Sequence, residues 1–232
     1  MSSEMDSMYE ILLELPLFKG ASMARISEIV GKAKFHFLKY LPGERIIEAR
    51  EECTHLKFII SGSVRSIASN NDGRFKVSQT LTAPDVICPD FLFGRDTRYP
   101  VEVIAIDTVA IVQVSKQDFL DILNIDRIFL FNYLNMVSVN AQKAVDGVLA
   151  VAAGALEERI AFWIIALTQP GGKDIKLQCR QRDLYSLFGV QRSSFLSTLE
   201  QMRDRGMIEF NNTEIKIVSR RALLDLVIHS PE

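Results

Sequence analysis

The sequence is poor in cysteine, in histidine and in long apolar runs, and each absence excludes a class of protein. Its three cysteines, at positions 53, 88 and 179, have no short spacing. They predict neither a disulfide framework nor a zinc site, and they are typical of a reducing cytoplasm. No apolar run reaches the roughly 18 residues that a membrane-spanning helix requires. The first residues lack the basic and apolar pattern of a secretion signal.

The chain also has no strong excess of either charge, with a net charge of −2. Its charge is unevenly distributed, however. Residues 1–154 carry 16 Lys and Arg against 19 Asp and Glu, whereas residues 155–232 carry 11 against 10. Within residues 176–205 there are six basic residues and three acidic ones. Because contacts with nucleic-acid phosphates are local, a local basic patch is sufficient for binding DNA.

Residues 180–205 have the pattern of two short helices joined by a tight turn at Gly189. Leu184, Leu187 and Phe188 give the first helix an apolar face. In the second helix an i, i+4, i+7 spacing predicts one buried stripe, made of Phe195, Leu199 and Met202. The outward face keeps four polar residues near the helix N-terminus: Gln191, Arg192, Ser193 and Ser197. A DNA-recognition helix needs this apolar back and this polar front, which meets base edges in the major groove.

The residues around this helical pair support the same interpretation. Residues 207–218 alternate between apolar and polar around an Asn-Asn turn, which predicts a hairpin wing. Arg192 is the long cation at the front of the second helix, so we expect it to contact bases. Arg180 and Arg182 precede or open the first helix, and we expect them to bind phosphates. The alternative is a helical pair that caps another core, since such patterns also arise by chance.

Residues 35–115 contain repeated short runs rich in Val, Ile, Phe and Thr, separated by turn signals with Gly, Pro and Asn. Five runs are strand-sized and evenly spaced: 56–60, 64–67, 76–81, 101–106 and 109–114. This pattern predicts a cupin-like antiparallel β-roll. Residues 5–33 precede it, and we expect them to form one or two short helices with a break at Gly20.

A single long helix is predicted from about Lys116 to Val151. Seven of its apolar residues are spaced alternately by four and three positions: Leu130, Leu134, Val137, Ala141, Ala144, Val148 and Val151. A 3.5-residue period over three heptads is typical of a coiled-coil seam, so we expect this helix to form a homodimer. The alternative is packing against its own β-domain. The helix can make both contacts at once, because it is apolar on more than one face.

The predicted fold class is therefore α+β, with three parts in order. Residues 1–115 would form the sensor domain with its N-terminal helices and β-roll. Residues 116–153 would form the dimerisation helix, and residues 154–232 the winged helix-turn-helix domain. Gly154 is the expected hinge, followed by a helix from Leu156 to Leu167.

This order of parts resembles the cyclic-AMP receptor and fumarate-nitrate regulator superfamily of bacterial transcription factors, over nearly the whole chain. Residues 58–64, Phe-Ile-Ile-Ser-Gly-Ser-Val, resemble its strand-turn-strand signature. Residues 86–93 lie where its phosphate-binding cassette begins, and residues 188–195 resemble its recognition-helix motif. The resemblance implies a transcription regulator that binds double-stranded DNA, is not an enzyme, and has RNA polymerase as a further candidate partner.

By this resemblance Arg192 takes the place of the family's base-reading arginine, while Ser193 and Ser197 replace a glutamate and a second arginine. Arg180 and Arg182 match positions that bind phosphates. Two of the three base-reading positions therefore differ from the best-known members. We expect a different half-site, because a serine cannot accept a hydrogen bond from cytosine N4 as a carboxylate does.

The effector site departs from the cyclic-nucleotide-binding members as well. The family's Gly-Glu and Arg-Ser or Arg-Thr pairs align with Cys88-Pro89 and Tyr99-Pro100, and its adenine-binding Thr-Ser pair aligns with Ala144-Val145. The two prolines also lack the N–H groups that bind an anion. The expected effector pocket consists of Cys88, Asp90, Tyr99, Ala144 and Val145. We expect an effector other than cyclic AMP, an unidentified small molecule or none, although Asp90, Arg95 and Arg98 offer an alternative set of anchors.

The residue content bears on three further alternatives. A haem or redox sensor would need axial or reactive ligands such as His36, His55 or Cys88, and a single His or Cys in a β-roll is more often a core residue. An iron–sulfur sensor would need N-terminal cysteines, and residues 1–52 contain none. A cupin-type metalloenzyme needs two or three converging histidines, and one of the three here, His229, lies outside the β-roll. No metal and no cofactor is therefore assigned.

Overall fold

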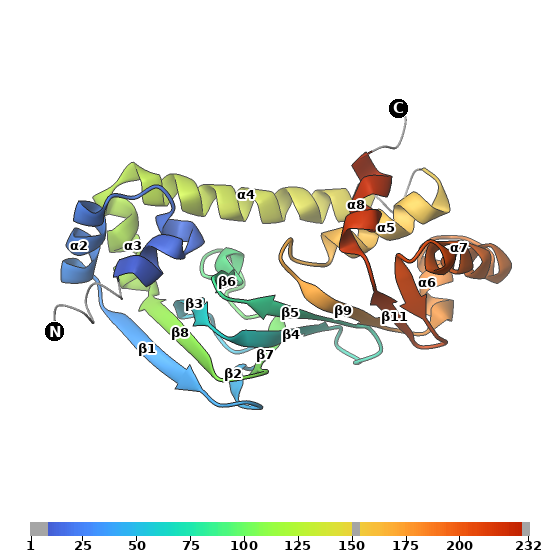
Figure 1. Ribbon diagram of the computed structural model, residues 1–232, viewed down its shortest axis with the longest axis horizontal. Helices are drawn as coiled ribbons and strands as arrows, with labels where there is room; N and C mark the ends of the chain where they lie inside the picture. Colours follow the sequence, from blue (N-terminus) through green and yellow to red (C-terminus); the bar gives the residue numbers. More distant parts are fainter. Residues whose placement is uncertain (1–8, 150–153, 229–232) are drawn as a thin grey trace. The chain divides into compact units, whose positions relative to one another are not determined.

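The structure is a computed structural model, which describes residues 9–149 and 154–228 (Figure 1). The chain divides into two compact units. The N-terminal unit contains residues 1–65 and 81–140, and the C-terminal unit contains residues 66–80 and 141–232. The sequence predicted boundaries at residues 115 and 153 instead. The difference is that a hairpin of the β-roll groups with the C-terminal unit and that the long helix is shared between the units.

The N-terminal unit begins with helical residues 9–14, the 3-10 helix η1 (Pro16–Phe18) and α2 (Met23–Lys32). Ser22 caps α2 by accepting a hydrogen bond from the backbone N–H of Arg25 at 3.4 Å. The short helices expected before residue 33 are therefore present.

A four-stranded antiparallel sheet in this unit has the strand order β1-β8-β3-β6. Its strands are β1 (Phe35–Tyr40), β3 (His55–Ser61), β6 (Asp85–Ile87) and β8 (Val109–Ser115). Phe58 lies opposite Val112 on one side and Val86 on the other, and all three are buried. Strands β2 (Arg45–Ile47) and β7 (Val101–Ala105) pair antiparallel in the same unit. The prediction of an antiparallel β-roll is confirmed.

The strand-turn-strand signature requires glycine at its turn because a larger residue would not fit there. Gly62 lies between β3 and β4 (Ser63–Ser69) with a φ of +83°. A Cβ at this position would lie 2.5 Å from Oδ1 of Asp107 and 2.6 Å from the carbonyl oxygen of Thr108. The same Asp107 Oδ1 accepts a hydrogen bond from the Ser63 N–H at 2.9 Å. Both the backbone angle and the close approach therefore require glycine.

The predicted long helix is interrupted, and the expectation of one continuous helix is wrong. α3 spans Lys116–Ile125 and α4 spans Arg127–Leu149, with Asp126 extended between them (φ −149°, ψ 141°). The Asp126 carboxylate accepts a hydrogen bond from the Ile128 N–H at 3.1 Å and forms an ion pair with Arg25 at 3.0 Å. An aspartate that caps a new helix in this way competes with continuation of the old one.

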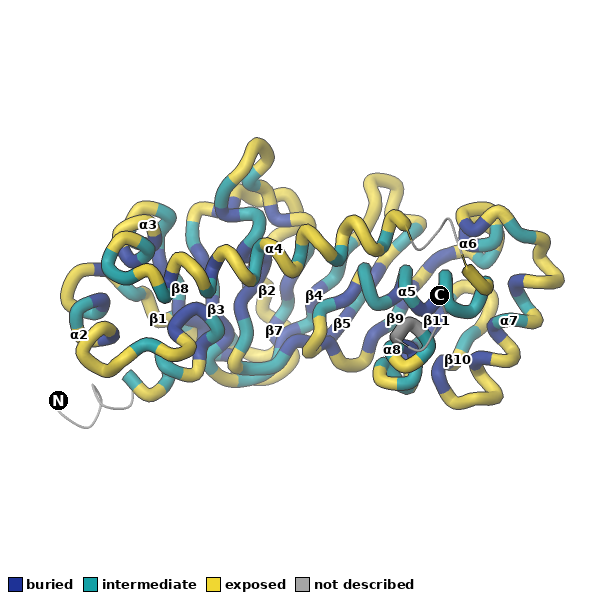
Figure 2. The backbone as a smooth tube through the Cα atoms, turned by 90° about the horizontal axis from the view of Figure 1, so that it is seen from above, coloured by how far each residue is buried: buried dark blue, intermediate teal, exposed yellow. Residues whose placement is uncertain are grey.

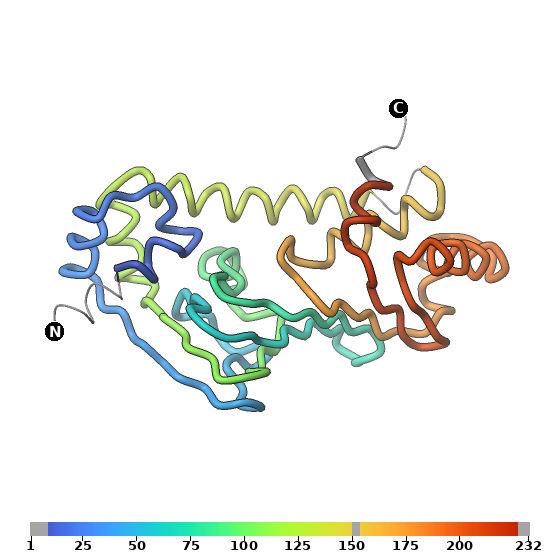
Figure 3. The backbone as a smooth tube through the Cα atoms, viewed as in Figure 1, coloured from blue at the N-terminus to red at the C-terminus, as the bar shows by residue number. Residues whose placement is uncertain are grey.

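A second antiparallel sheet organises the C-terminal unit. β5 (Lys76–Thr82), the second strand of the β4–β5 hairpin, pairs with β9 (Lys173–Gln178), and β9 pairs with β11 (Glu214–Ile217). Val77 and Ile215 lie opposite Leu177 on its two sides. In Figure 3 the hairpin strand runs alongside the orange chain of β9. The sequence analysis did not predict β9.

Four helices complete this unit: α5 (Leu156–Ala166), α6 (Gln181–Leu187), α7 (Arg192–Asp204) and α8 (Arg220–Ile228). Their buried side chains form one core, which includes Ile160, Ile164, Phe188, Phe195 and Leu199. β10 (Ile208–Phe210) pairs with β11 as the predicted wing hairpin. None of the helices in the described residues is long and apolar enough to cross a membrane.

Candidate nucleic-acid interface

The turn between α6 and α7 is held by backbone geometry and by one arginine. Gly189 has a φ of +64°, and its N–H donates to the Ser186 carbonyl at 3.2 Å. From α5, Arg159 donates from Nη2 to the Phe188 carbonyl oxygen at 2.6 Å, and its guanidinium lies 5.6 Å from the centre of the Phe188 ring. The arginine therefore satisfies a carbonyl at the C-terminal end of α6, which the helix itself leaves unpaired.

The back of α7 is completely buried. Phe195, Leu199 and Met202 each have 0% exposure, as their spacing predicts. The Phe195 ring stacks on that of Phe188 with a centroid distance of 6.3 Å and contacts Tyr185 at 6.5 Å. These contacts determine the rotation of α7 about its own axis and thereby which residues face outward.

The front of α7 is exposed and polar. Gln191 is the N-cap residue, and the structure places Gln191, Arg192, Ser193 and Ser197 at exposed positions. In the part of the chain that the structure describes, no hydrogen bond or ion pair occupies the Arg192 guanidinium. No side chain caps the first turn either, so its backbone N–H groups remain available to a phosphate.

Arg180 and Arg182 lie at the start of α6. Both are exposed, with Arg180 at the N-cap of α6 and Arg182 in its first turn. Gln181, between them, donates from Nε2 to the carbonyl oxygen of Asn211 in the wing turn at 3.0 Å. This hydrogen bond ties the start of α6 to the wing turn, and Arg180 lines a surface hollow together with Asn211 and Thr213 of that turn.

Two other arginines are neutralised, which the sequence did not reveal. Arg203 forms an ion pair with Asp204 at 3.0 Å and lies 5.7 Å from the centre of the Phe210 ring. Arg205 forms an ion pair with Glu157 of α5. Lys176, the sixth basic residue of this stretch, lies 4.0 Å from a carboxylate oxygen of Glu214. The positive charge counted over residues 176–205 is therefore concentrated at Arg180, Arg182 and Arg192, whose guanidinium groups have no acidic partner among the described residues.

One expected core residue lies at the surface. Leu187 is 45% exposed, whereas Leu184 and Phe188 are buried. The expectation that all three form the buried apolar face of α6 is wrong for Leu187, which instead lines an open cavity with Phe75 and Trp163.

Three of the five expected effector residues, Cys88, Asp90 and Tyr99, lie in the N-terminal unit, where they are buried or hydrogen-bonded within the fold. Tyr99 is buried and donates from its hydroxyl to the His55 carbonyl at 2.9 Å, and burial raises the pKa of the Cys88 thiol. Asp90 accepts a hydrogen bond from Asn140 Nδ2 at 3.1 Å. Ala144 and Val145 are exposed on α4, and the alternative anchors Arg95 and Arg98 are exposed as well.

The histidines of the β-roll lie at its surface edge. The rings of His36 and His55 are 6.4 Å apart, and His55 Nδ1 lies 2.8 Å from the Thr54 hydroxyl. Burial lowers the pKa of His55. Across the described ranges, 9–149 and 154–228, no three His, Cys, Asp or Glu side chains converge as metal ligands.

The 4-3 stripe of α4 is mostly exposed in the single chain. Leu134 is 47% exposed and Val148 73%, whereas Val137 is partly buried. Leu130, Ala141 and Ala144 are also exposed, and Val151 lies outside the described residues. A different face of α4 packs on the β-roll, where Phe129 and Tyr133 are buried and the Tyr133 hydroxyl donates to the Pro89 carbonyl at 3.0 Å. Figure 2 shows this helix largely in the colours of exposed and intermediate residues.

Comparison with known proteins identifies both halves of the chain. Residues 37–126 match the model of the cyclic nucleotide-binding domain, and residues 158–226 match that of the Crp-like helix-turn-helix domain. The chain belongs to the cyclic-AMP receptor and fumarate-nitrate regulator superfamily. The resemblance stated from the sequence is confirmed, and the combination of these two domains supports a DNA-binding transcription regulator.

Individual relatives are distant. The potassium channel SKOR of Arabidopsis thaliana is 32% identical over 117 residues, which are 48% of this chain but only 13% of the channel. The sensor domain of the transcriptional regulator DNR from Pseudomonas aeruginosa has a TM-score of 0.52 and 15% identity, over 65% of this chain and 96% of that one. The catabolite activator protein of Thermus thermophilus has a TM-score of 0.49 and 16% identity, over 92% and 98%. The DNR comparison supports the fold and no more.

Proposed function

We propose that this protein is a homodimeric, sequence-specific transcription regulator that recognises an inverted-repeat DNA operator with α7. The main support for this proposal is that α7 is amphipathic. Its apolar back is completely buried, and its exposed front consists of Gln191, Arg192, Ser193 and Ser197. A helix held in this way enters a major groove with its N-terminal residues against base edges.

Each exposed cation of this surface has a distinct expected role. Arg192, at the first position of α7, can donate two hydrogen bonds to O6 and N7 of a guanine. Arg180 and Arg182, at the start of α6, would bind backbone phosphates and set the register without selecting a base. Ser193 and Ser197 replace longer side chains of the best-known members, so the preferred half-site would differ from theirs.

The exposed 4-3 stripe of α4 supports a dimer. A second copy of the same stripe is its natural complement, because a 3.5-residue period packs against itself as a coiled coil. A two-fold dimer presents two α7 helices related by the same axis. The operator would therefore be an inverted repeat with half-sites about one helical turn apart.

The first experiment is selection of binding sites from random DNA with the full chain, with and without cell extract as a source of effector. We expect an inverted repeat to emerge. Arg192→Ala should then weaken binding by about 1–3 kcal/mol and relax the preference at one base pair in each half-site. Arg221→Ala, which removes an exposed arginine of α8, is the matched control and should change neither quantity. If no site can be selected under either condition, the protein is not a sequence-specific regulator.

The signal that controls the protein would differ from cyclic AMP. No carboxylate is placed at Cys88-Pro89 for a ribose hydroxyl and no guanidinium at Tyr99-Pro100 for a cyclic phosphate, while Tyr99 is buried with its hydroxyl engaged. Calorimetry with cyclic AMP and cyclic GMP should show no binding at physiological concentrations. Micromolar affinity for either nucleotide would show that Asp90, Arg95 or Arg98 provides a rearranged site.

Regulation would act by a shift between two arrangements of the paired winged helices. A ligand in the β-roll, or a standing preference without a ligand, would bias that equilibrium. We expect the protein to act in a reducing cytoplasm, where its buried thiols remain free, with DNA, its own second copy and RNA polymerase as partners.

A further inference from the structure

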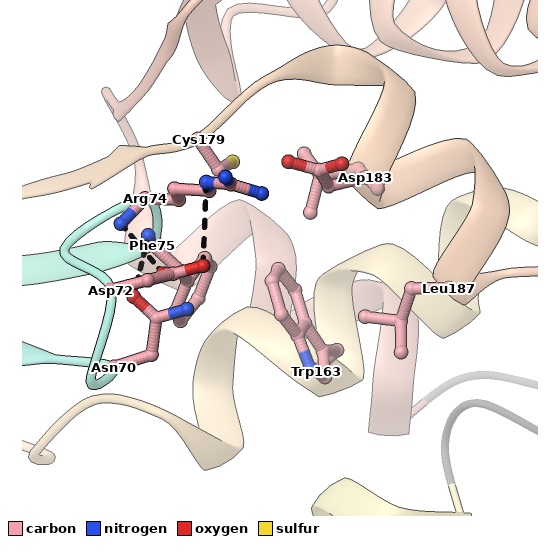
Figure 4. Close-up of a pocket in the computed structure, with 9 residues that line it drawn as sticks. Asn70, Asp72, Arg74, Phe75, Trp163, Cys179, Asp183 and Leu187 are labelled. Atoms are coloured by element: carbon pink, nitrogen blue, oxygen red, sulfur yellow. Dashed lines mark hydrogen bonds and ion pairs between the residues drawn. The ribbon is translucent and has the colours of Figure 1, made fainter.

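A cavity beside the helix-turn-helix has no part in the function proposed above. It lies within the C-terminal unit and has a volume of about 420 Å³. Three segments bound it: the β4–β5 hairpin, α5, and the stretch from Cys179 into α6 (Figure 4). Its wall includes four large apolar side chains, Phe75, Trp163, Leu184 and Leu187.

The apolar wall of this cavity is only partly covered by the chain itself. The rings of Phe75 and Trp163 lie 5.5 Å apart at an angle of 46°, and both are partly exposed. Leu187 is 45% exposed at the end of α6. Partly exposed aromatic rings in a concave surface, with a few polar groups around them, are typical of sites for small organic ligands.

The polar groups of the cavity leave one negative charge without a counter-charge. Asp72 already holds Arg74: its Oδ2 lies 3.3 Å from Arg74 Nε, and its Oδ1 accepts from the Arg74 backbone N–H at 3.1 Å. Asp183 approaches the same space from α6 (Figure 4). Within residues 9–149 and 154–228 the Asp183 carboxylate has no ion-pair partner. Its charge is felt inside the cavity, where burial and then Asp183 raise the pKa of Cys179 to about 11.

We propose that this cavity binds a small organic cation with a planar apolar body, of the aromatic amidine or amine class. The planar body packs against Trp163 and Phe75, and the cationic group lies beside Asp183. An aromatic face and a carboxylate both attract a cation, whereas neither favours an anion. Arg74 also lines the cavity, but its charge is paired with that of Asp72, so Asp183 is the favoured position for an added cation.

The location of the cavity connects it to DNA recognition. Asp183, Leu184 and Leu187 belong to α6, and Leu184 packs in the same core as Phe195 of α7. The other wall belongs to the β4–β5 hairpin, which continues directly into the β-roll. A ligand that bridges the hairpin and α6 would therefore change DNA affinity. This regulatory consequence rests on the proposed function, but binding to the cavity does not.

Trp163 makes binding measurable without DNA, because it is the single tryptophan of the chain. Benzamidine, benzamide and benzoate share one ring and differ in charge, so they test the proposal as probes. In a titration of Trp163 fluorescence in the full chain, benzamidine should produce a saturable change with an affinity about five-fold higher than that of benzamide. Benzoate should bind more weakly than either.

Two variants localise the effect. Asp183→Asn should reduce benzamidine affinity to that of benzamide, while Asp204→Asn, a change at an aspartate of α7 outside the cavity, should leave the preference intact. Leu187→Lys places a cation at the exposed rim of the cavity and should also lower the affinity for benzamidine. The proposal is overturned if the three probes titrate alike, if none changes the fluorescence, or if Asp183→Asn keeps the five-fold preference.

The regulatory consequence is tested afterwards with a selected operator and saturating benzamidine. A changed operator affinity that Asp183→Asn abolishes supports it, and an unchanged affinity contradicts regulation while the binding site stands. Failure to select any operator would count against the proposed function alone, because the fluorescence titration does not depend on DNA.

Discussion

The helices α4 and α7 both carry an apolar stripe, but the stripe of α7 is buried within the chain and that of α4 is mostly exposed. The apolar stripe of α7 has 0% exposure at Phe195, Leu199 and Met202. The 4-3 stripe of α4 is 47% exposed at Leu134 and 73% at Val148. In α7 the single chain provides the apolar partner and leaves a polar face for a ligand. In α4 most of the stripe stays exposed over the residues that the structure describes.

This difference identifies which kind of partner each helix needs. Exposed apolar area is unfavourable in water by about 25 cal/mol per Å², so a contiguous stripe such as that of α4 favours association with another apolar surface. The exposed front of α7 has the opposite chemistry, with free hydrogen-bond donors and one cation, and suits the edges of bases and phosphate oxygens. The predictions below test this contrast, from the largest effect to the smallest.

The largest effect is expected from charging the α4 stripe. Leu134→Asp together with Val148→Asp should convert the dimer into monomers, because both subunits would bury two unpaired carboxylates at the seam. We expect the dissociation constant to rise by more than about 1000-fold in sedimentation equilibrium. Asn135→Asp with Gln142→Glu places the same charges on exposed polar positions off the stripe and should leave the dimer intact. A Leu134/Val148 double variant that remains dimeric would remove the seam assignment.

A smaller effect is expected when the apolar stripes of α7 and α4 are each truncated, and its dependence on protein concentration should differ between them. Phe195→Ala should destabilise the C-terminal unit by about 3–5 kcal/mol at any protein concentration, because it leaves a cavity in a closed core. Leu134→Ala should instead lower the free energy of unfolding only at protein concentrations where the dimer forms, since the Leu134 side chain is covered only in the dimer. Denaturant unfolding at two protein concentrations distinguishes these outcomes. Concentration-dependent destabilisation by Phe195→Ala would contradict the intrachain role of the α7 stripe.

The smallest effect concerns the arginines around α7. Arg182→Ala should weaken binding to specific and random DNA alike and reduce the slope of log affinity against log salt by about one. Arg203→Ala is the matched control, because Asp204 already neutralises Arg203, and it should leave the slope unchanged. Equal slopes for the two variants would mean that Arg182 makes no phosphate contact.

Much of the helix-turn-helix could be predicted because its signals are local. The positive φ of Gly189, the spacing of Phe195, Leu199 and Met202, and the alternation of the wing each depend on neighbours within one or two helical turns or across one tight hairpin. Five strands of the β-roll, β3, β4, β5, β7 and β8, were likewise predicted from short apolar runs and turn residues, whereas the short strand β6 was not. These patterns report which side of each element is buried, whatever covers it.

The failures occurred where a distant residue decides the outcome. β9 has only two buried apolar residues, Ile175 and Leu177, and is a strand because β5 and β11 pair with its two edges. The helix predicted from residue 116 stops at Asp126, where the side chain caps α4 and meets Arg25. Arg205 loses its free charge to Glu157. Apart from the local cap of Asp126 on Ile128, which the periodicity of the apolar residues concealed, none of these partners is visible from sequence spacing.

The sequence by itself therefore determined the elements and the chemistry that each displays: the polar front and apolar back of α7, the 4-3 stripe of α4, and the absence of cyclic-nucleotide ligands at Cys88-Pro89 and Tyr99-Pro100. The tertiary structure alone decided which cations stay free, which stripe stays uncovered, and that Phe75 and Trp163 meet beside Asp183 in one cavity. The physical reason is the separation in sequence between the residues that interact. Periodicity and turn geometry act between near neighbours, whereas ion pairing, strand pairing and cavities depend on residues that only the folded chain brings together.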